Sequence, residues 1–289
     1  MTAVLRSKKV VHFIKRLAGF SLGVVLFYAP FALLVRGYGL LFPASGASAS
    51  IADVHGACLR MPLGWLSQPW MWPAIGDSAI AWLPIAVLPL SAVAVGPWFC
   101  GWLCPAGALP EHLSRMVPDR FKFDFKRHVD IVPMRYGFLA GILLVPFVAS
   151  SLNCALCNFG QMQNIVSGAF GNMSGFAFFS SMSLIAAALW IIPLGLFTKG
   201  GRGWCLFLCP AGTAMGFSSW ISRKLPWAFR VRSDAAECVG CTTCEDVCPT
   251  RAAGVSPEGE QTIDAHLCNQ CQDCVTACPA GALEYRTPR

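Results

Sequence analysis

Charged side chains are scarce in this sequence. Asp, Glu, Lys and Arg together make up 13% of the 289 residues, whereas hydrophobic residues make up 55%, and the mean hydropathy is +0.55. So apolar a composition excludes an ordinary soluble protein with one compact core. Helix-turn-helix and RNA-binding motifs are also absent, and we expect no nucleic-acid partner.

Acidic residues are especially rare in the first 233 residues, which contain 6 Asp and Glu against 19 Lys and Arg. Residues 234–289 reverse the balance, with 9 acidic residues against 3 basic ones. The basic part fits loops that lie beside a membrane and contact anionic lipid headgroups. The acidic part fits a surface that recruits a basic redox partner, and it fits a merely solvated surface equally well.

Four apolar stretches are long enough to cross a bilayer, at about residues 17–35, 78–97, 136–152 and 176–197. Several contain proline, which a spanning helix tolerates when its neighbours satisfy the freed backbone groups. Basic residues precede the first stretch, separate the second from the third and follow the fourth, whereas the other two loops hold only Arg36 and Arg60. The positive-inside rule then predicts a multi-pass protein of the bacterial inner membrane with both termini in the cytoplasm.

The most specific motif lies near the C-terminus. It reads Cys238-x2-Cys241-x2-Cys244-x3-Cys248-Pro249 and then Cys268-x2-Cys271-x2-Cys274-x3-Cys278-Pro279. This is the bacterial ferredoxin spacing for two [4Fe-4S] clusters, in which the fourth cysteine of each run ligates the other cluster. We therefore expect one cluster on Cys238, Cys241, Cys244 and Cys278 and the other on Cys268, Cys271, Cys274 and Cys248. Zinc and disulfides are the alternatives, and eight cysteines in this register disfavour both.

A second cysteine motif occurs twice. Residues 98–107 and 203–212 both contain Cys-x3-Cys-Pro-Ala-Gly, at the ends of the second and fourth apolar stretches. We infer a parallel repeat of two hairpins. Residues four apart share one face of a helix, so each pair can point at a common site. If the pairs meet, Cys100, Cys104, Cys205 and Cys209 form a four-thiolate site for iron, zinc or an iron–sulfur cluster. Redox-active dithiols, and cysteines that merely pack helix ends, are the other interpretations.

Three further cysteines are expected on the outer side of the membrane. Cys154 and Cys157 form a Cys-x2-Cys pair, and Cys58 lies in the other outward loop. In an oxidising periplasm the pair is a disulfide, a metal-ligand pair or a redox couple. All three interpretations stay open.

The expected architecture is therefore an all-α membrane protein with a small α+β domain. Residues 1–16 form a basic cytoplasmic N-terminus, and residues 17–228 form four transmembrane helices in two parallel hairpin repeats. Residues 229–289 form a cytoplasmic 2[4Fe-4S] ferredoxin-type domain, whose thiolates stay available in the reducing cytoplasm.

Four spans, a double-cluster ferredoxin and two Cys-x3-Cys-Pro motifs resemble the NapH/MauN family of membrane ferredoxin-type proteins. The resemblance covers the whole chain, and NosR- and CcoG-type proteins share these modules beside additional domains. It implies a quinol dehydrogenase subunit that exchanges electrons between the quinol pool and a periplasmic respiratory or dehydrogenase system, such as nitrate reduction. The implied partners are a periplasmic multi-cluster ferredoxin or a c-type cytochrome. The Cys154-x2-Cys157 pair is not part of the NapH motif set, so the pathway stays open.

The alternative is a maturation or metal-handling factor of the MauN or CcoG type. In that case ferredoxin electrons reduce or load thiol sites in the membrane or the periplasm. No catalytic residue is identified, and no His–Glu or similar constellation in the apolar stretches marks a quinone pocket.

Overall fold

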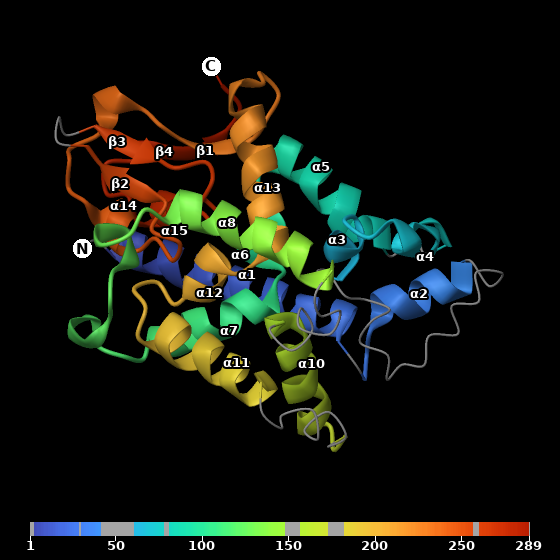
Figure 1. Cartoon of the computed structure of the whole chain (residues 1–289). Coiled ribbons are helices and arrows are strands. Elements are labelled where there is room, and N and C mark those ends of the chain that lie inside the picture. The colour runs from blue at the N-terminus through green and yellow to red at the C-terminus, as the bar shows by residue number, and fades with distance from the viewer. Residues whose placement is uncertain are drawn as a thin grey trace.

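The computed structural model describes residues 3–28, 30–41, 61–77, 81–147, 157–172, 182–256 and 260–288. The described chain is mostly helical, and its strands lie in the C-terminal region (Figure 1). The first repeat and the elements before it comprise α1 (Ala3–Phe27), α2 (Leu33–Leu41), α3 (Met61–Trp65), α4 (Trp72–Asp77), α5 (Leu88–Val95), α6 (Trp98–Trp102) and α7 (Pro105–Ser114). The second repeat comprises α8 (Ile131–Leu144), α10 (Asn158–Ala169), α11 (Met182–Ile191), α12 (Gly203–Phe207) and α13 (Pro210–Ile221).

Among the described residues, one helix is long and apolar enough to cross a membrane, namely Ser7–Phe27 within α1. Three shorter apolar helices, Pro84–Val95, Ile131–Leu144 and Leu184–Leu196, overlap the other expected spans. At about 1.5 Å per residue, none of these three alone covers the roughly 30 Å of a bilayer core.

The first expected span, residues 17–35, does not coincide with one helix. α1 begins at Ala3, so the basic N-terminal residues from there on are helical, and α1 ends at Phe27. The chain then turns, and α2 begins at Leu33. Pro30 lies in this turn, and proline both lacks an N–H donor and disfavours a helical residue before it. Ala32 takes a left-handed backbone conformation with a φ of 42°.

The two helices that lead into the Cys-x3-Cys motifs share a local irregularity. Each contains one wide π-helical turn, at Leu83–Val87 before α5 and at Ile192–Leu196 after α11. Proline is the second residue of both turns, as Pro84 and Pro193. A π turn is a common way to accommodate a residue that cannot donate to the regular helical ladder. The two halves of the chain are thus alike in backbone detail as well as in sequence.

The C-terminal domain contains two small antiparallel sheets and two short helices. They are β1 (Arg230–Ser233), α14 (Thr243–Asp246), β2 (Ala253–Val255), β3 (Gln261–Ile263), α15 (Asp273–Ala277) and β4 (Leu283–Arg286). β1 pairs with β4, placing Val231 opposite Tyr285, and β2 pairs with β3. This is the α+β arrangement expected of residues 229–289.

The C-terminal domain packs directly on the helical part of the chain. α15 lies beside α1 (Figure 1). The Tyr285 hydroxyl donates a hydrogen bond of 2.8 Å to the carbonyl oxygen of Val95 at the end of α5. Trp102 in α6 donates its indole N–H to the carbonyl oxygen of Gln270 at 3.1 Å. A Cβ on Gly101 would clash with the carbonyl oxygen of Asn269, so glycine is required for this close approach.

Candidate functional site

The first set of ferredoxin cysteines surrounds a single cavity. Cys238, Cys241, Cys244 and Cys278 all line it, together with apolar side chains such as Leu283. Burial raises the pKa of the Cys244 thiol, and the neighbouring Cys241 and Cys238 add to the rise. Cys241 is exposed, so this group of thiols lies close to the protein surface.

The second set lies deeper. Cys268, Cys274 and Cys248 belong to one buried core, which the C-terminal domain shares with Ile131 and Phe207 of the helical part. Burial raises the pKa of the Cys268 thiol to about 12, and Cys248 adds to the rise. Burial also raises the pKa of Cys271 and of Cys274, each again with a contribution from Cys248. The last cysteine of the first run therefore lies among the first three cysteines of the second run.

The two cysteine loops share the same backbone geometry. Gly240 and Gln270 occupy equivalent positions and both have positive φ, of 66° and 55°. Thr242 and Gln272, two residues further on, also have positive φ, of 58° and 64°. A chain that alternates into the left-handed region turns successive N–H groups inward, which creates the concave anion sites found around iron–sulfur clusters. The strain is notable at Thr242, because a β-branched residue rarely adopts this conformation.

These observations fit [4Fe-4S] clusters. The first group supplies four thiols around one cavity, and in the second group Cys248 lies near the other three thiols. Buried thiols with raised pKa values stay protonated until a metal displaces their protons. When bound, such a cluster supplies one-electron transfer. Among the described residues, no three His, Cys, Asp or Glu side chains gather closely enough to hold a single metal ion.

The repeated Cys-x3-Cys motifs also meet at one place. Cys100, Cys104, Cys205 and Cys209 line a single enclosed cavity between the two repeats. Burial raises the pKa of the Cys100 thiol strongly, and the nearby thiols of Cys104, Cys209 and Cys205 contribute to the rise. The structure thus brings together the four thiols that the repeat predicts.

The two cysteines of each Cys-x3-Cys pair do not lie on one face of a single helix, contrary to what the spacing predicts. Cys100 lies inside α6, but Cys104 is extended, with a φ of −80° and a ψ of 103°, and forms the N-cap of α7. Cys209 repeats this arrangement before α13, with a φ of −84° and a ψ of 107°. The cause is the following proline, which excludes a helical conformation for the residue before it. The two cysteines of a pair therefore belong to two successive helices rather than to one face of a continuous helix.

Polar groups without partners surround the four thiols. In the described part of the chain, three residues that line this cavity have a buried side-chain atom with no hydrogen-bond partner: Arg202 Nη2, Asn269 Nδ2 and Asn158 Oδ1. Two of these atoms are N–H donors, and an unpaired buried donor is costly. The Cys209 sulfur accepts a hydrogen bond of 3.3 Å from the backbone N–H of Gly212 at the start of α13. The cavity is thus provided with donors and with positive charge for an anionic, sulfur-rich occupant.

The four-thiol cavity also borders the ferredoxin domain. His266, Leu267, Cys268 and Asn269 form part of its wall. Cys268 belongs to the second ferredoxin set, so one loop contributes to both places. The arrangement can carry electrons between the repeat cysteines and the C-terminal domain over a short distance.

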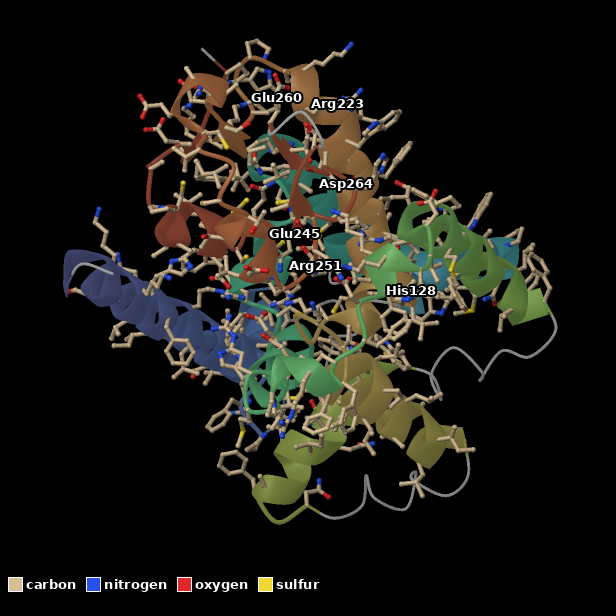
Figure 2. The ribbon with its side chains drawn as sticks, turned by 90° about the vertical axis from the view of Figure 1, so that its left-hand side faces the viewer. His128, Arg223, Glu245, Arg251, Glu260 and Asp264 are labelled. Carbon is tan, nitrogen blue, oxygen red and sulfur yellow. The ribbon has the colours of Figure 1, made fainter. Side chains whose placement is uncertain are left out.

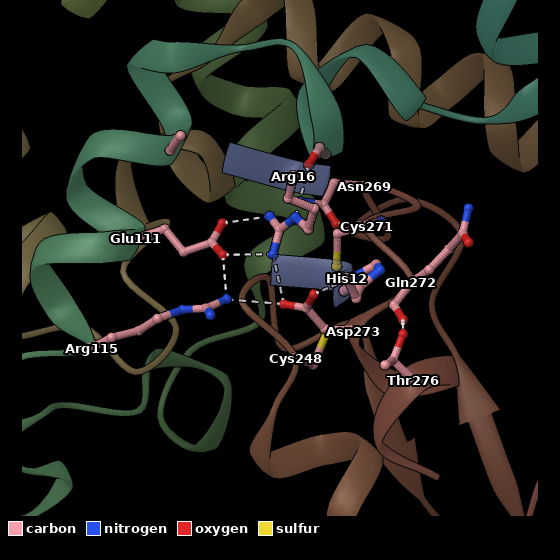
Figure 3. A network of polar contacts seen from close by, with 12 residues as sticks. His12, Arg16, Glu111, Arg115, Cys248, Asn269, Cys271, Gln272, Asp273 and Thr276 are labelled. Carbon is pink, nitrogen blue, oxygen red and sulfur yellow. Dashed lines mark hydrogen bonds and ion pairs between the residues drawn. The ribbon is translucent and has the colours of Figure 1, made fainter. Parts of the chain in front are cut away.

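A buried ionic network joins the repeats, α1 and α15, and sequence reasoning missed it (Figure 3). Glu111 in α7 is 1% exposed and accepts hydrogen bonds from Arg16 in α1, from Arg115 and from Arg202. Arg16 and Arg115 also donate to Asp273 of α15, at 2.7 and 3.0 Å. Arg202 donates to the carbonyl oxygen of Cys100 at 2.7 Å. The network therefore supports both the four-thiol cavity and the second ferredoxin loop.

Burial alone would raise the pKa of Glu111, but Arg202, Arg16 and Arg115 hold that pKa well below its usual range. The same pairing keeps the pKa of Arg202 raised in spite of burial. One sequence signal was available. Glu111 is one of only 6 acidic residues before residue 234, and an acidic residue in so apolar a region needs buried partners.

A second ionic contact holds the C-terminal domain on the segment between the repeats. Arg251, labelled in Figure 2, donates to Asp124 and to Glu245, both at 2.8 Å. Arg251 and Asp124 are buried, so the contact is not an exposed pair.

Of the three cysteines predicted to face outward, the structure describes Cys157. Cys58 and Cys154 lie outside the described residues. Cys157 is buried at the N-cap of α10 and packs in the helical core with Phe159. It lines neither the four-thiol cavity nor the first ferredoxin cavity.

Comparison with known families agrees with this geometry. A family described as "4Fe-4S dicluster domain" matches residues 237–282. A family described as "4Fe-4S binding domain" matches twice, at residues 78–127 and 182–228, which contain the two Cys-x3-Cys motifs. The chain therefore contains a 4Fe-4S dicluster domain and two 4Fe-4S binding segments of the ferredoxin type.

More particularly, it is distantly related to several named proteins. It is 27% identical over 192 residues to the putative electron transport protein YccM of Escherichia coli, covering 64% of this chain and 49% of that protein. It is 32% identical over 182 residues to the regulatory protein NosR of Pseudomonas aeruginosa, covering 61% and 23%. The ferredoxin-type protein NapH of Haemophilus influenzae is 28% identical over 195 residues, covering 65% and 62%. The chain thus matches about half of YccM and about a quarter of NosR. No solved structure matches it.

Proposed function

We propose that this chain is a membrane-bound protein that takes electrons from quinol and passes them through iron–sulfur centres to a redox partner. The observation that carries the proposal is the shared wall between the four-thiol cavity and the ferredoxin loop at Cys268. An electron carrier with isolated ferredoxin clusters has no need of further cysteines buried between its helices. Here four more thiols lie directly beside the second cluster loop.

The balance of electrons supports two ferredoxin centres as acceptors. Oxidation of one quinol to quinone releases two electrons and two protons, and each [4Fe-4S] cluster accepts one electron. The chain's own residues contribute the thiolates, the burial and the N–H donors that tune the potential. The apolar helix Ser7–Phe27 supplies a membrane anchor, and the further spans predicted from the sequence extend it.

The four thiols of Cys100, Cys104, Cys205 and Cys209 hold a third centre in this proposal. Four thiolates suit an iron–sulfur cluster, and the match of both motifs to a family described as "4Fe-4S binding domain" favours a cluster over single iron or zinc. Arg202 Nη2 and Asn269 Nδ2 would donate hydrogen bonds to its sulfur atoms. Such bonds stabilise the more reduced, more negative state and raise the reduction potential.

Iron counting on the purified full chain tests the third centre. Two cubanes contain about eight irons and three contain about twelve. We expect about twelve in the wild type and about eight in Cys100→Ser and Cys205→Ser. Cys157→Ser is the matched control, because serine suits the N-cap of α10 and Cys157 does not line the four-thiol cavity. About eight irons in the wild type would refute the third centre.

Reduction by quinol tests the function itself. In proteoliposomes that contain the full chain, a short-chain quinol should bleach the visible absorbance of the clusters. Dithionite serves as the positive control, because it reduces clusters without a quinol site. Clusters that dithionite bleaches and quinol does not would rule out the proposed function.

A further inference from the structure

A third cavity lies between α1, α7 and the cluster-binding helices α14 and α15. Its volume is about 290 Å³, and its walls include Phe13, Val247 and Ala277 beside charged side chains. Small-molecule sites start at about 300 Å³, so this cavity suits a single substituted ring rather than a nucleotide. Four basic and four acidic side chains line it besides His12. This balance favours a neutral ligand over an anion.

His12 and Asp273 form a paired proton-handling group in the cavity wall. His12 Nε2 lies 2.9 Å from Asp273 Oδ1 (Figure 3). The other oxygen of Asp273 accepts hydrogen bonds from Arg16 and Arg115, so its carboxylate acts only as an acceptor here. The pairing therefore assigns the proton to Nε2 and leaves Nδ1 as the ring's hydrogen-bond acceptor. A histidine held in this tautomer by a carboxylate is suited to accept a proton from a bound hydroxyl group.

The pair lies next to the second ferredoxin loop. Asp273 falls between Cys271 and Cys274 in the sequence, and the ring of Trp102 contacts His12 at a centroid distance of 5.3 Å. His12 is thus paired with a residue of the second cluster loop, and its neighbour Trp102 donates to the carbonyl oxygen of Gln270 in the same loop. Residues in or next to both cluster-binding helices, including Asp273 and Val247, form part of the same cavity wall as His12.

The cavity also adjoins an apolar surface. Phe13 lines the cavity and is 38% exposed. Val10 and Leu17, three residues before and four after it on α1, are 52% and 46% exposed. Residues at this spacing share one helix face. An apolar strip therefore leads along the candidate membrane helix to the cavity, as a ring with a long hydrocarbon tail requires.

From these observations we infer that this cavity binds the ring of the quinol, with His12 accepting a hydrogen bond and then a proton from one ring hydroxyl. The inference rests on the proposed function. The oxidation balances as follows: quinol loses two electrons, one to each ferredoxin cluster, and two protons, one to His12 and one to water at the open side of the cavity. His12⁺ then pairs with the Asp273 carboxylate until its proton passes to solvent.

The experiment compares His12→Gln with His128→Gln in the cluster-loaded full chain. His128 is a matched control, because it stacks on Phe123 and does not line this cavity. Binding of a hydroxyquinoline N-oxide, a fluorescent quinol analogue, is measured by quenching, and cluster reduction by a short-chain quinol is measured in parallel. Loss of one hydrogen bond to the ligand predicts about tenfold weaker binding for His12→Gln at unchanged iron content. His128→Gln should match the wild type.

A second variant separates ligand binding from the ionic network. Phe13→Trp narrows the cavity without changing His12 or Asp273, and it should also weaken binding of the analogue. If both variants bind the analogue and accept quinol electrons as the wild type does, the cavity assignment is wrong while the proposed function stands. If quinol does not reduce the wild type, the proposed function fails and the inference fails with it.

Discussion

Glu111→Gln should destabilise the protein more than any change of an exposed charge. Glu111, Arg16 and Arg202 are each at most 2% exposed, and four hydrogen bonds from three arginines end on the Glu111 carboxylate. Glutamine keeps the shape but replaces one acceptor oxygen by an NH2 group that faces arginine donors. Removing one partner of a buried ionic group costs about 3–5 kcal/mol, because the remaining charges stay buried. That is a large share of the roughly 5–15 kcal/mol that stabilises a typical domain.

Thermal unfolding of the detergent-solubilised full chain, with limited proteolysis of the C-terminal domain, measures the effect. The control is Asp119→Asn. Asp119 pairs with Lys122 at 2.8 Å, but its side chain is 82% exposed, so the loss should be about 0–1 kcal/mol. Because the network connects α7 with α1 and α15, Glu111→Gln should also expose the C-terminal domain to protease. Equal unfolding temperatures for the two variants would refute this account of the network.

A double variant tests whether an unpaired buried charge causes the loss of stability in Glu111→Gln. Removing Glu111 and Arg202 together, as Glu111→Leu with Arg202→Leu, takes out both charges, while Arg16 and Arg115 keep Asp273 as a partner. Replacing a buried pair by apolar groups is often close to neutral, so the double variant should be more stable than Glu111→Gln. A double variant that is less stable would show that the cost does not come from an unpaired buried charge.

Three further outcomes follow from the structure. Gly101→Ala should lower the unfolding temperature, because the new Cβ would meet the backbone of Asn269. Gly160 has open space around it, so Gly160→Ala should be neutral or stabilising. Equal effects of the two substitutions would contradict the close docking of α6. Cys248→Ala should impair the cluster held by the second cysteine loop and leave the first intact in Mössbauer or EPR spectra; loss of the first cluster alone would contradict the interleaved ligation. The lowered pKa of Glu111 means that its stabilising contribution is complete above the unfolded value of about 4.3 and is lost as the pH falls below it. The difference in unfolding temperature between wild type and Glu111→Gln should therefore be constant from pH 7 to about pH 5 and shrink in stronger acid.

The presence of 4Fe-4S binding domains could be predicted from the sequence because cluster ligation depends on short cysteine spacings. In each run two residues separate the first three cysteines, so their thiols can share one cluster, and a proline follows the fourth cysteine. The repeated Cys-x3-Cys motif likewise predicts the meeting of Cys100 with Cys205. The motif does not predict that the helix breaks between the two cysteines of each pair. A spacing of four residues suggests one continuous helix, whereas Pro105 and Pro210 break that helix one residue earlier, at the second cysteine.

Other features depend on contacts that no local pattern contains. Glu111 and Arg202 lie 91 residues apart, and Arg16 and Asp273 lie 257 apart. Neither distance corresponds to a helical or strand period, so only the folded chain reveals the network. The first span was placed too late in the chain for a related reason: hydropathy averages over Pro30, whereas the backbone turns there.

The four-thiol cavity has a consequence for the ancestry of the chain. Each repeat alone supplies two thiols, so a single ancestral hairpin would have completed the site only as a symmetric pair. Joining two copies in one chain allowed the halves to diverge around unchanged cysteines. At the position of Glu111 the second repeat has Gly216, and at the position of Arg202 the first repeat has Pro97. The ion pair between the halves is therefore one-sided, and at the equivalent place in the second repeat Gly216 instead lets the backbone of His266 in the C-terminal domain approach closely.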